Sequence, residues 1–499
     1  MSKKVIIIGA GIAGLSTGCY LRMNGYDTEI FEMHTIPGGL CTSWERGNYI
    51  FDGCINWLVG SYPTNNHYHL WNELIDMKTL KFVDPREYVR VEDNNGQFIS
   101  MRTNVDELER ELLEKAPEDK ELITAFTGAI RRLLDLQLPI EKAPETSNLL
   151  DNIKKMLKFM PYLRDFKKWI RIPTSEIAKK CRNPLLEKTF KFTVVPEMSV
   201  FFLIMTLTWM HQKGAGYPIG GSLKFARLIE KKYLELGGEI HYNSRVKKII
   251  TRDNAATGIL LENGETHESD IVVSAADGHS TIFEMLEGKY TDKTILRYYE
   301  DYKTFPSYLQ FSLGVSRTFP DVPHRLVFPL GKPLVIDPHT SYEDLKVRVF
   351  NFDPTLAPEG KTVITSLLHT NNYRYWLDLR KNNKEKYKHE KRRIVDEIIE
   401  ILEKKFGNIK SNVDVTDIST PATVIRYTNN WKGSLGSWLL TPEMGLKPLK
   451  RMLPGLKNFY MAGQWVEPCG GLPPAIKSAR NTAQVICKKD KKKFATTRY

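Results

Sequence analysis

The segment "KKVIIIGAGIAGLSTGCYLRMNGYDTEIFEMH" (residues 3–34) decides the fold of this chain. Lys4 to Ile8 form a short, almost entirely apolar run, which is typical of a strand buried on both faces of a sheet. A glycine motif follows at once, then a helix that Gly25 is placed to end in the left-handed conformation. A second strand, Thr28 to Phe31, leads into an acidic residue. This order predicts a βαβ unit that binds a dinucleotide.

The glycine motif has the GxGxxG spacing, and each glycine has a mechanical reason. Gly9 permits the tight turn, Gly11 lets the backbone approach a diphosphate, and Gly14 lets the helix pack closely on the strand. The free N–H groups and the dipole at the helix N-terminus favour the anion. Glu32 can accept hydrogen bonds from the ribose hydroxyls.

A second glycine pair indicates which dinucleotide is bound. The segment Pro37–Leu58 carries Gly38 and Gly39 and then a run rich in aromatic residues and glycine. A nicotinamide-binding unit would usually continue into a helix at this point. A glycine turn just after the acidic residue instead resembles the extension found in flavoproteins of the amine-oxidase-like superfamily. The sequence therefore favours FAD.

Length and charge limit the other classes of protein. The 499 residues exceed what one hydrophobic core usually supports, so two intertwined domains are expected. The formal net charge is +13, and a diffuse positive charge suits an anionic membrane surface or acidic ligands. We find no helix-turn-helix, zinc-finger or RNA-binding signature, so nucleic acid is not expected as a partner.

The cysteines and apolar stretches bear on location. None of the six cysteines forms a CxxC pair, so no metal site is expected. Their irregular spacing in a large chain argues for reduced thiols and a cytoplasmic protein. No signal peptide is expected, and the longest apolar stretch, Ser199–Met210, is too short to span a bilayer. Peripheral association with the inner face of a membrane remains open.

Residues 148–180 form a basic amphipathic segment, which Pro161 is expected to break. Lysines alternate with apolar residues that can share one side: Met156, Leu157, Met160, Leu163, Phe166, Trp169 and Ile170. This pattern is typical of a membrane-surface helix. A helix packed on its own core with a solvated basic face gives the same pattern, so both interpretations stand.

We interpret the stretch "AGQWVEPCGGLPPAIKSAR" (residues 462–480) as the second half of a cofactor site whose first half is the N-terminal glycine motif. Phe459 to Ala462 fit a last strand of the nucleotide domain, and Gly463 permits close approach to a ligand. Pro473 and Pro474 suit the first turn of a helix, where missing N–H groups do least harm. The N-terminus of that helix is expected to donate to flavin N1 and O2.

The motifs occur in the order of a known family. These are the opening segment, a YPxGG helix start at Tyr217, a proline–arginine–glycine segment from Pro421 to Ser434, and the C-terminal stretch. Together they resemble the phytoene-dehydrogenase-like flavoproteins, which include carotene desaturases, carotenoid isomerases and retinol saturases. Leu40 stands where the family often has arginine or lysine, and Gln464 where many members have aspartate.

The resemblance implies an FAD site with a defined set of residues. The backbone at Val246 is expected to contact the adenine. The whole set is Gly9, Gly11, Ile12, Ala13, Gly14, Glu32, Gly38, Gly39, Leu40, Val246, Gly463, Gln464, Gly471, Leu472 and Pro473.

The resemblance also implies an activity. We expect an FAD-dependent oxidoreductase that desaturates, saturates or isomerises carbon–carbon bonds of a hydrophobic polyene or unsaturated lipid, such as a carotenoid or retinoid. Two alternatives remain: an amine oxidase of the same superfamily, and a non-catalytic prenyl-binding protein of the GDP-dissociation-inhibitor type. The sequence does not choose the substrate, the reaction direction, the electron acceptor or the oligomeric state.

Few residues can be assigned to the substrate side. An apolar, aromatic pocket is expected, with candidate lining from Trp57, Trp209, Trp431, Trp438 and Trp465, although core packing is the commoner role for each tryptophan taken alone. Glu467 and Asn56 are the candidates for acid–base or polar roles, against solvated or capping roles.

The fold class that follows is α/β. A Rossmann-like FAD-binding domain (1–75, 216–285 and 445–490) is interleaved with a mixed-sheet substrate domain (286–444). A helical region that contacts substrate or membrane (76–215) and a solvated basic tail (488–499) complete the chain.

Overall fold

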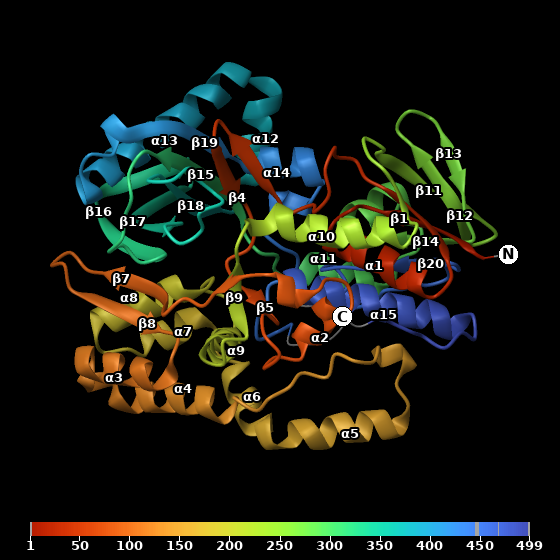
Figure 1. Ribbon diagram of the computed structural model, residues 1–499, viewed down its shortest axis with the longest axis horizontal. Helices are drawn as coiled ribbons and strands as arrows, with labels where there is room; N and C mark the ends of the chain where they lie inside the picture. The colour runs from red at the N-terminus through yellow and green to blue at the C-terminus, as the bar shows by residue number, and fades with distance from the viewer. Residues whose placement is uncertain (1, 445–448, 468, 498–499) are drawn as a thin grey trace.

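The computed structural model describes residues 2–444, 449–467 and 469–497. Residues 445–448, at the start of the third expected FAD-domain segment, and the last two residues of the expected tail lie outside this description. A five-stranded parallel sheet organises the nucleotide side of the molecule (Figure 1). Its spatial order is β10 (Glu239–His241), β2 (Asp27–Phe31), β1 (Lys4–Ile8), β14 (Ile271–Ser274) and β20 (Phe459–Met461).

Alternating side chains of β1 bury both faces of this sheet. Val5 and Ile7 join a core formed with helices α1 (Ile12–Met23), α10 (Gly221–Glu235) and α15 (Leu472–Lys489). Ile6 and Ile8 join another core, formed with an antiparallel sheet. That sheet consists of β11 (Val246–Arg252), β12 (Ala255–Leu261) and β13 (Thr266–Glu268). The predicted βαβ unit is confirmed, and its first strand is central because both its faces are apolar.

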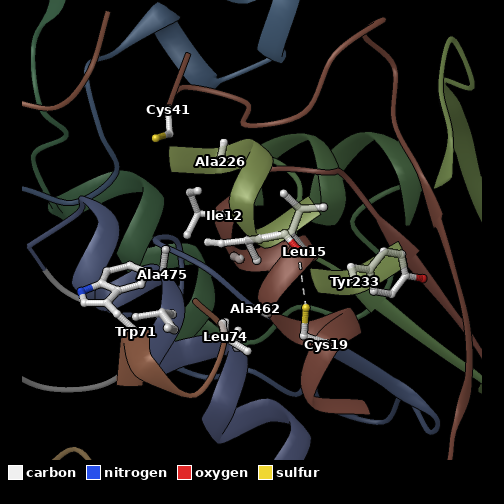
Figure 2. Packing of buried hydrophobic residues seen from close by; sticks show 14 of the residues in the cluster. Ile12, Leu15, Cys19, Cys41, Trp71, Leu74, Ala226, Tyr233, Ala462 and Ala475 are labelled. Atoms are coloured by element: carbon white, nitrogen blue, oxygen red, sulfur yellow. Dashed lines mark hydrogen bonds between the residues drawn. The ribbon is translucent and has the colours of Figure 1, made fainter. Parts of the chain in front are cut away.

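Helix α1 lies between α10 and α15. Figure 2 shows Ile12, Leu15 and Cys19 of α1 among side chains of the other two helices, including Tyr233 of α10 and Ala475 of α15. A Cβ added at Gly14 would lie 1.9 Å from the carbonyl oxygen of Gly9, so no side chain fits between helix and strand. The close packing expected from the motif is therefore present.

A mixed seven-stranded sheet forms the other large layer. Helices α12 (Tyr373–Asn382) and α13 (Lys384–Phe406) cover it through a shared core that includes Trp376 and Ile398. The spatial order is β19 (Val413–Ser419), β15 (Ser307–Val315), β18 (Thr362–Thr370), β17 (Thr340–Val349), β16 (Arg325–Asp337), β7 (Glu87–Glu92) and β8 (Phe98–Arg102).

The expectation that residues 76–215 are a helical region is wrong at its start. β7 and β8 form a hairpin, and β7 pairs parallel with β16 of the large sheet. The reason is the alternation in β7, where Val89 and Val91 are fully buried between more polar neighbours. The rest of the range is mainly helical: α3 (Val105–Lys115), α4 (Lys120–Arg132), α5 (Leu149–Phe159), α6 (Leu163–Trp169), α7 (Thr174–Lys179), α8 (Pro184–Thr193) and α9 (Val200–His211).

Short elements connect the two sheets. They are β3 (Ser43–Arg46), β4 (Tyr49–Asp52), β5 (Leu58–Val59), α2 (His67–Asn72), β6 (Phe82–Val83), β9 (Ala215–Pro218), α11 (Lys293–Asp301) and α14 (Pro421–Thr428). Within the described residues, no helix combines the length and the apolar character needed to cross a bilayer.

The basic amphipathic segment breaks where Pro161 was expected to break it. α5 ends at Phe159, a 3₁₀ turn covers Met160–Tyr162, and α6 follows. The expected common apolar side is divided, however. Met156, Leu157 and Met160 are more than half exposed, whereas Trp169 and Ile170 lie in the core. The change of direction at the 3₁₀ turn separates the two groups.

The lysines of the C-terminal tail are exposed to solvent, but contacts with the nucleotide domain hold the segment in place. Lys488 and Lys489 are the last residues of α15. Beyond the helix, the Lys492 ammonium lies 4.1 Å from the centre of the Tyr26 ring, and the Tyr26 hydroxyl donates to Asp490. An aromatic face and a hydroxyl of the nucleotide domain therefore hold this segment against the fold.

We predict that Gly14→Ala destabilises the protein severely, because the added methyl group meets a backbone oxygen rather than a movable side chain. Urea unfolding should show a loss of at least about 3 kcal/mol, or no folded protein at all. The matched control is Gly331→Ala, where an added Cβ meets no atom within 4 Å. A Gly14→Ala variant as stable as this control would contradict the packing described.

Candidate active site

The two glycine turns near the N-terminus lie against each other. The Gly38 amide donates to the Ala10 carbonyl at 2.9 Å, and Gly11 and Gly38 form an isolated parallel bridge. Gly9 and Gly38 have φ values of 96° and 107°, in the region that favours glycine. The sequence therefore needs glycine here both for the turns and for their close contact.

Two helix N-termini open onto one cavity of about 370 Å³, which we call the dinucleotide cavity. Gly11 caps α1, so the N–H groups of Gly11, Ile12 and Ala13 have no acceptor within the helix. Gly471 caps α15, and the prolines that follow Leu472 leave Gly471 and Leu472 as the free donors of that end. All five donors belong to residues of the cavity wall. The arrangement favours a long anionic ligand.

Glu32 is buried in the wall of the dinucleotide cavity. One carboxylate oxygen accepts from the Ala10 amide at 2.6 Å, and the other accepts from the His34 amide at 2.8 Å. Burial raises the pKa of Glu32, and these backbone hydrogen bonds oppose that rise. The side chain joins the first glycine turn to the end of β2, and its remaining lone pairs are available to hydroxyl donors.

The residues expected to hold FAD mostly line the dinucleotide cavity. Gly14 and Pro473 are the two that do not. Gly14 packs beneath the turn against Gly9 and Ala275, and Pro473 lines a neighbouring cavity. The residues from the N-terminal and C-terminal segments meet because β1, β14 and β20 are parallel neighbours whose carboxyl ends share one edge.

Sequence reasoning missed part of this wall. Ala275, Ala276 and Asp277 follow β14 and line the cavity. Residues 427–430, at the C-terminal end of α14 and just beyond it, line the cavity too. The three residues after β14 could have been predicted from the sequence, because its apolar residues indicate a buried strand and ligands bind beyond the carboxyl ends of parallel strands. Residues 427–430 lie at a helix end with no comparable signal.

A larger cavity of about 520 Å³, the apolar cavity, adjoins the first. Cys54, Leu435, Gly471 and Leu472 line both cavities. Most of the other lining side chains are aliphatic or aromatic. They come from residues 55–59, from the segment before α5, from the end of α5, from α9 and from the segment before β15. They include Ile55, Trp57, Val59, Leu138, Ile140, Phe159, Phe201, Phe202, Met205, Trp209 and Phe305.

The five tryptophans proposed as lining divide into three groups. Trp57 and Trp209 line the apolar cavity, and Trp465 lines the dinucleotide cavity. Trp431 and Trp438 line neither of these cavities. They pack with Trp465 around the ring of Tyr299, so aromatic packing explains them.

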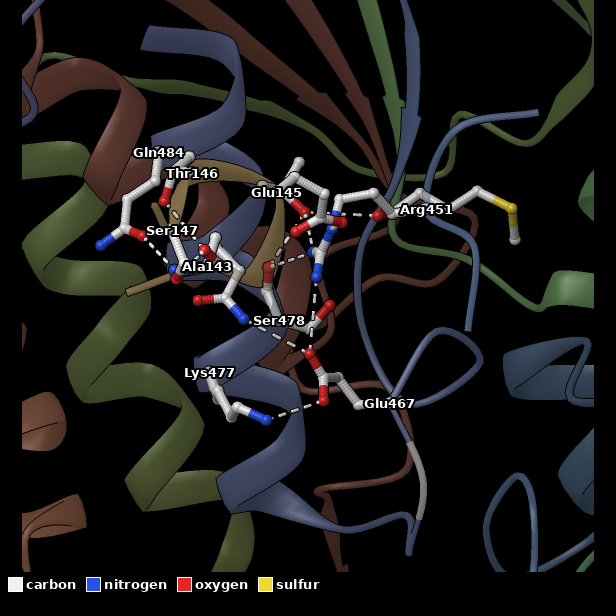
Figure 3. Close-up of polar contacts among 12 residues, drawn as sticks. Ala143, Glu145, Thr146, Ser147, Arg451, Glu467, Lys477, Ser478 and Gln484 are labelled. Carbon is white, nitrogen blue, oxygen red and sulfur yellow. Dashed lines mark hydrogen bonds and ion pairs between the residues drawn. The ribbon is translucent and has the colours of Figure 1, made fainter. Parts of the chain in front are cut away.

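One corner of the apolar cavity is ionic (Figure 3). Glu467 is 2% exposed, and its carboxylate lies 3.0 Å from the Lys477 ammonium and 3.5 Å from the guanidinium of the fully buried Arg451. Arg451 is also paired with Glu145 at 2.6 Å. His67 lines the same cavity, and burial, followed by the charge of Lys477, lowers its pKa to about 3. The histidine is therefore neutral at ordinary pH.

Asn56 is fixed in the wall of the apolar cavity by two buried arginines. Its side-chain oxygen accepts from Arg348 at 3.0 Å, and its carbonyl oxygen accepts from Arg325 at 3.0 Å. Arg325 and Arg348 are directly opposite each other on β16 and β17. They therefore place positive charge behind Asn56, and the residue has no freedom to act as a mobile group.

The residues of the dinucleotide cavity fit FAD. A Cβ added at Gly11 or Gly39 would meet only one protein atom within 4 Å, at 3.8 and 3.5 Å, and one at Gly471 would meet none. Since all three glycines line the cavity, the missing side chains keep space for a ligand rather than for protein. Among the residues that the structure describes, no group of His, Cys, Asp and Glu is arranged to hold a metal.

A family model described as flavin-containing amine oxidoreductase matches residues 12–487. A prolycopene isomerase of Daucus carota chloroplasts is 26% identical over 487 residues, which cover 94% of this chain and 77% of the relative. A lycopene-forming phytoene desaturase of a Paracoccus species is 24% identical, with 97% of each chain covered. The cyclohexylamine oxidase of Brevibacterium oxydans has a similar fold, with a TM-score of 0.60 at 12% identity over 99% of this chain and 100% of that one.

We predict that Asp277 makes stability depend on pH. Burial raises its pKa from 3.8 to about 7, although it accepts amide hydrogen bonds from Ser280 and Trp431. The folded protein therefore holds this proton more tightly than the unfolded chain does. The contribution of Asp277 to the free energy of unfolding is present below about pH 4 and is lost as the pH rises through about 7.

The measurement is thermal and urea unfolding of the cofactor-free protein between about pH 4 and pH 8. Wild type should lose up to about 4 kcal/mol more than Asp277→Asn over this interval. Asp378→Asn, at an exposed position of α12, is the control and should follow wild type. Parallel pH profiles for wild type and Asp277→Asn would refute the assignment.

Proposed function

The chain belongs to the flavin-containing amine oxidoreductase family, and we propose that this FAD-dependent oxidoreductase acts on carbon–carbon bonds of a hydrophobic polyene or unsaturated lipid. Desaturation, saturation and isomerisation are all reactions of this kind. The names of the prolycopene isomerase and phytoene desaturase relatives support a carotenoid-like substrate.

The observation that carries the proposal is the charge balance of the apolar cavity. Its described wall contains one carboxylate, Glu467, and one ammonium, Lys477, and these two are paired. The cavity therefore offers a large apolar surface with no uncompensated charge beside the dinucleotide cavity. Such a space suits a neutral hydrophobic molecule whose reacting carbons are shielded from water.

The charge balance of the apolar cavity also distinguishes the proposed function from its alternatives. A substrate amine is a cation at neutral pH, and the cavity holds no free carboxylate to pair with it among its described residues. A prenyl-binding protein without redox chemistry would not need the dinucleotide cavity. A yellow purified protein that loses its colour with dithionite would exclude that class, and a colourless protein that does not take up FAD would overturn our proposal.

We propose that FAD is held along the two helix N-termini. The α1 amides of Gly11, Ile12 and Ala13 bind the diphosphate, Glu32 binds the ribose, and the α15 amides of Gly471 and Leu472 stabilise negative charge on the ring system. Val246, Gly463 and Gln464 complete the wall. When bound, FAD supplies hydride transfer at N5.

The chain contributes Glu467 and Asn56 on the substrate side. We propose that the Glu467 carboxylate accepts or returns the proton at the carbon next to the one that exchanges hydride. Its oxygens lie 3.0 Å from the Lys477 ammonium and 3.5 Å from the Arg451 guanidinium, which hold the side chain in place. Asn56, backed by Arg325 and Arg348, is a fixed polar contact that orients the substrate.

We also propose that α5 attaches the protein to an anionic membrane surface. No residue of α5 is buried, and one side exposes large apolar side chains: Leu149, Leu150, Ile153, Met156 and Leu157, continued by Met160. Lys154 and Lys158 are exposed on the same helix. Phe159, at its end, lines the apolar cavity, so a lipid could pass from bilayer to cavity along this helix. Six free cysteines support a cytoplasmic location.

We predict that Met205→Trp abolishes turnover without loss of FAD. Met205 lines the apolar cavity from α9 but not the dinucleotide cavity, so a larger ring there fills substrate space only. Anaerobic changes in flavin absorbance with a panel of carotenes, retinoids and unsaturated fatty acids should show at least about a tenfold loss for the responding compound.

Met452→Trp is the matched control, because Met452 is 43% exposed and lines neither cavity. It should react as wild type does. If no polyene or unsaturated lipid changes the flavin of the wild type while simple amines reduce it, the amine-oxidase alternative is correct and the proposal fails.

A second prediction concerns α5. Replacing Leu150, Met156 and Leu157 together with glutamate should abolish co-sedimentation with anionic vesicles at low salt, because these side chains supply exposed apolar area. Turnover of a detergent-solubilised substrate should remain, since none of the three lines the apolar cavity.

The control replaces Leu234, Leu296 and Val335 with glutamate. These residues are also exposed, at 49%, 36% and 45%, but they lie on other elements. The control should pellet with vesicles as wild type does. Equal loss in both triple variants would show that general charge, rather than α5, governs binding.

A further inference from the structure

A third cavity, of about 370 Å³, also adjoins the dinucleotide cavity. The residues at this contact differ from those at which the apolar cavity meets the dinucleotide cavity. It shares Gly39, Leu40, Tyr427 and Thr428 with the dinucleotide cavity. Its walls come from β3, β19, α12, α13 and α14, most of which are seen together at the top of Figure 1. We call it the cationic cavity, after its charges.

Three helices each supply one cation to its wall. Arg380 of α12 donates to the Ala422 carbonyl at 3.1 Å, the Lys391 ammonium of α13 lies 5.5 Å from the Tyr387 ring centre, and the Arg426 guanidinium of α14 lies 4.1 Å from the Tyr427 ring centre. Within the described residues, none of the three cations has a carboxylate within ion-pair distance.

The acidic side of this wall is already occupied. Asp417 is its one carboxylate among the described residues, and it accepts from the Trp44 indole at 2.7 Å and pairs with Arg46 at 3.4 Å. Nothing in the described wall is therefore left to neutralise the three cations.

Arg380 and Arg426 are close enough for the positive charge of one to disfavour the protonated form of the other. Burial, followed by the charge of Arg380, lowers the pKa of Arg426. Burial and the charge of Arg426 lower the pKa of His34, which lines the same cavity and is therefore neutral at pH 7. Like charges gathered without a counter-ion are relieved when an anion binds, and guanidinium groups suit phosphate oxygens.

Aromatic rings lie among these charges. Trp44, Tyr387 and Tyr427 all line the cationic cavity, and rings of this kind can stack with a planar base. A ligand that uses both features carries several phosphate charges and an aromatic base. Contact with the dinucleotide cavity at Gly39 and Leu40 places that ligand beside the site proposed for FAD.

We propose that the cationic cavity binds a phosphorylated nicotinamide dinucleotide, NADPH, as the redox partner of FAD. A hydride leaves C4 of the dihydronicotinamide with both electrons and passes to the flavin, a proton from water completes the reduction of FAD, and NADP⁺ is released. The inference uses the FAD site of the family and does not depend on the identity of the carbon substrate.

The first test measures binding of NADP⁺ to the FAD-loaded protein by calorimetry at low salt. Wild type should bind it saturably and should bind NAD⁺ at least about tenfold more weakly, since the additional phosphate adds charge-assisted contacts. The double variant Arg380→Ala, Lys391→Ala should bind NADP⁺ at least about tenfold more weakly than wild type.

The matched control is Arg374→Ala, Lys388→Ala. It removes one arginine and one lysine from the same two helices at exposed positions outside the cavity. It should bind NADP⁺ within about twofold of wild type. The single variant Arg426→Gln, at an exposed residue, should weaken binding in the same direction if the double variant does not fold.

The second test mixes NADPH with the protein without oxygen, and the yellow colour of the flavin should fade in wild type and control. Absence of saturable NADP⁺ binding would overturn the proposal, and so would equal losses in the two double variants or binding without fading. Loss of FAD itself from Arg380→Ala, Lys391→Ala would show that the cavity serves the FAD diphosphate. Dithionite-reduced protein still tests the carbon substrate, so the two proposals fail separately.

Discussion

The contact that the whole site depends on is the one between α1 and β1. Gly14 lets the helix approach until the space for a Cβ at that position falls within 1.9 Å of the Gly9 carbonyl oxygen. This approach fixes where the α1 N-terminus points, and Gly463 then lies against Ala13, with 3.1 Å between its would-be Cβ and the alanine methyl. Looser packing of α1 would separate the two helix N-termini that share the dinucleotide cavity.

Parallel strand pairing brings the distant segments to this contact. β1 lies between β2 and β14, and β20 pairs with β14, so their carboxyl ends form one edge. Segments separated by more than 400 residues therefore supply one binding wall. The apolar cavity begins where the wall changes from glycine and amide groups to aromatic side chains, at Cys54, Leu435, Gly471 and Leu472. The dinucleotide cavity and the apolar cavity thus share one continuous surface.

Much of the wall of the dinucleotide cavity could be predicted because its signals are local. A glycine with positive φ, a helix start and a buried strand each follow from a few adjacent residues, and Gly9, Glu32 and Gly471 were identified in that way. The substrate side could not be predicted as well. Trp431 and Trp209 were both proposed to line the substrate pocket, yet the first packs against Tyr299 and the second lines the apolar cavity. No local pattern separates these two environments.

The sequence by itself determined the βαβ unit, the paired glycine turns and the C-terminal helix start, because backbone conformation and strand burial are set by neighbouring residues. Tertiary structure alone decided which charges are neutralised. Glu467 is paired with Lys477, ten residues away on another element. Arg380, Lys391 and Arg426 instead converge from three helices, and no carboxylate of the described residues lies within ion-pair distance of them. Electrostatic energy depends on distance in space, and that distance is fixed only when the sheets and helices pack.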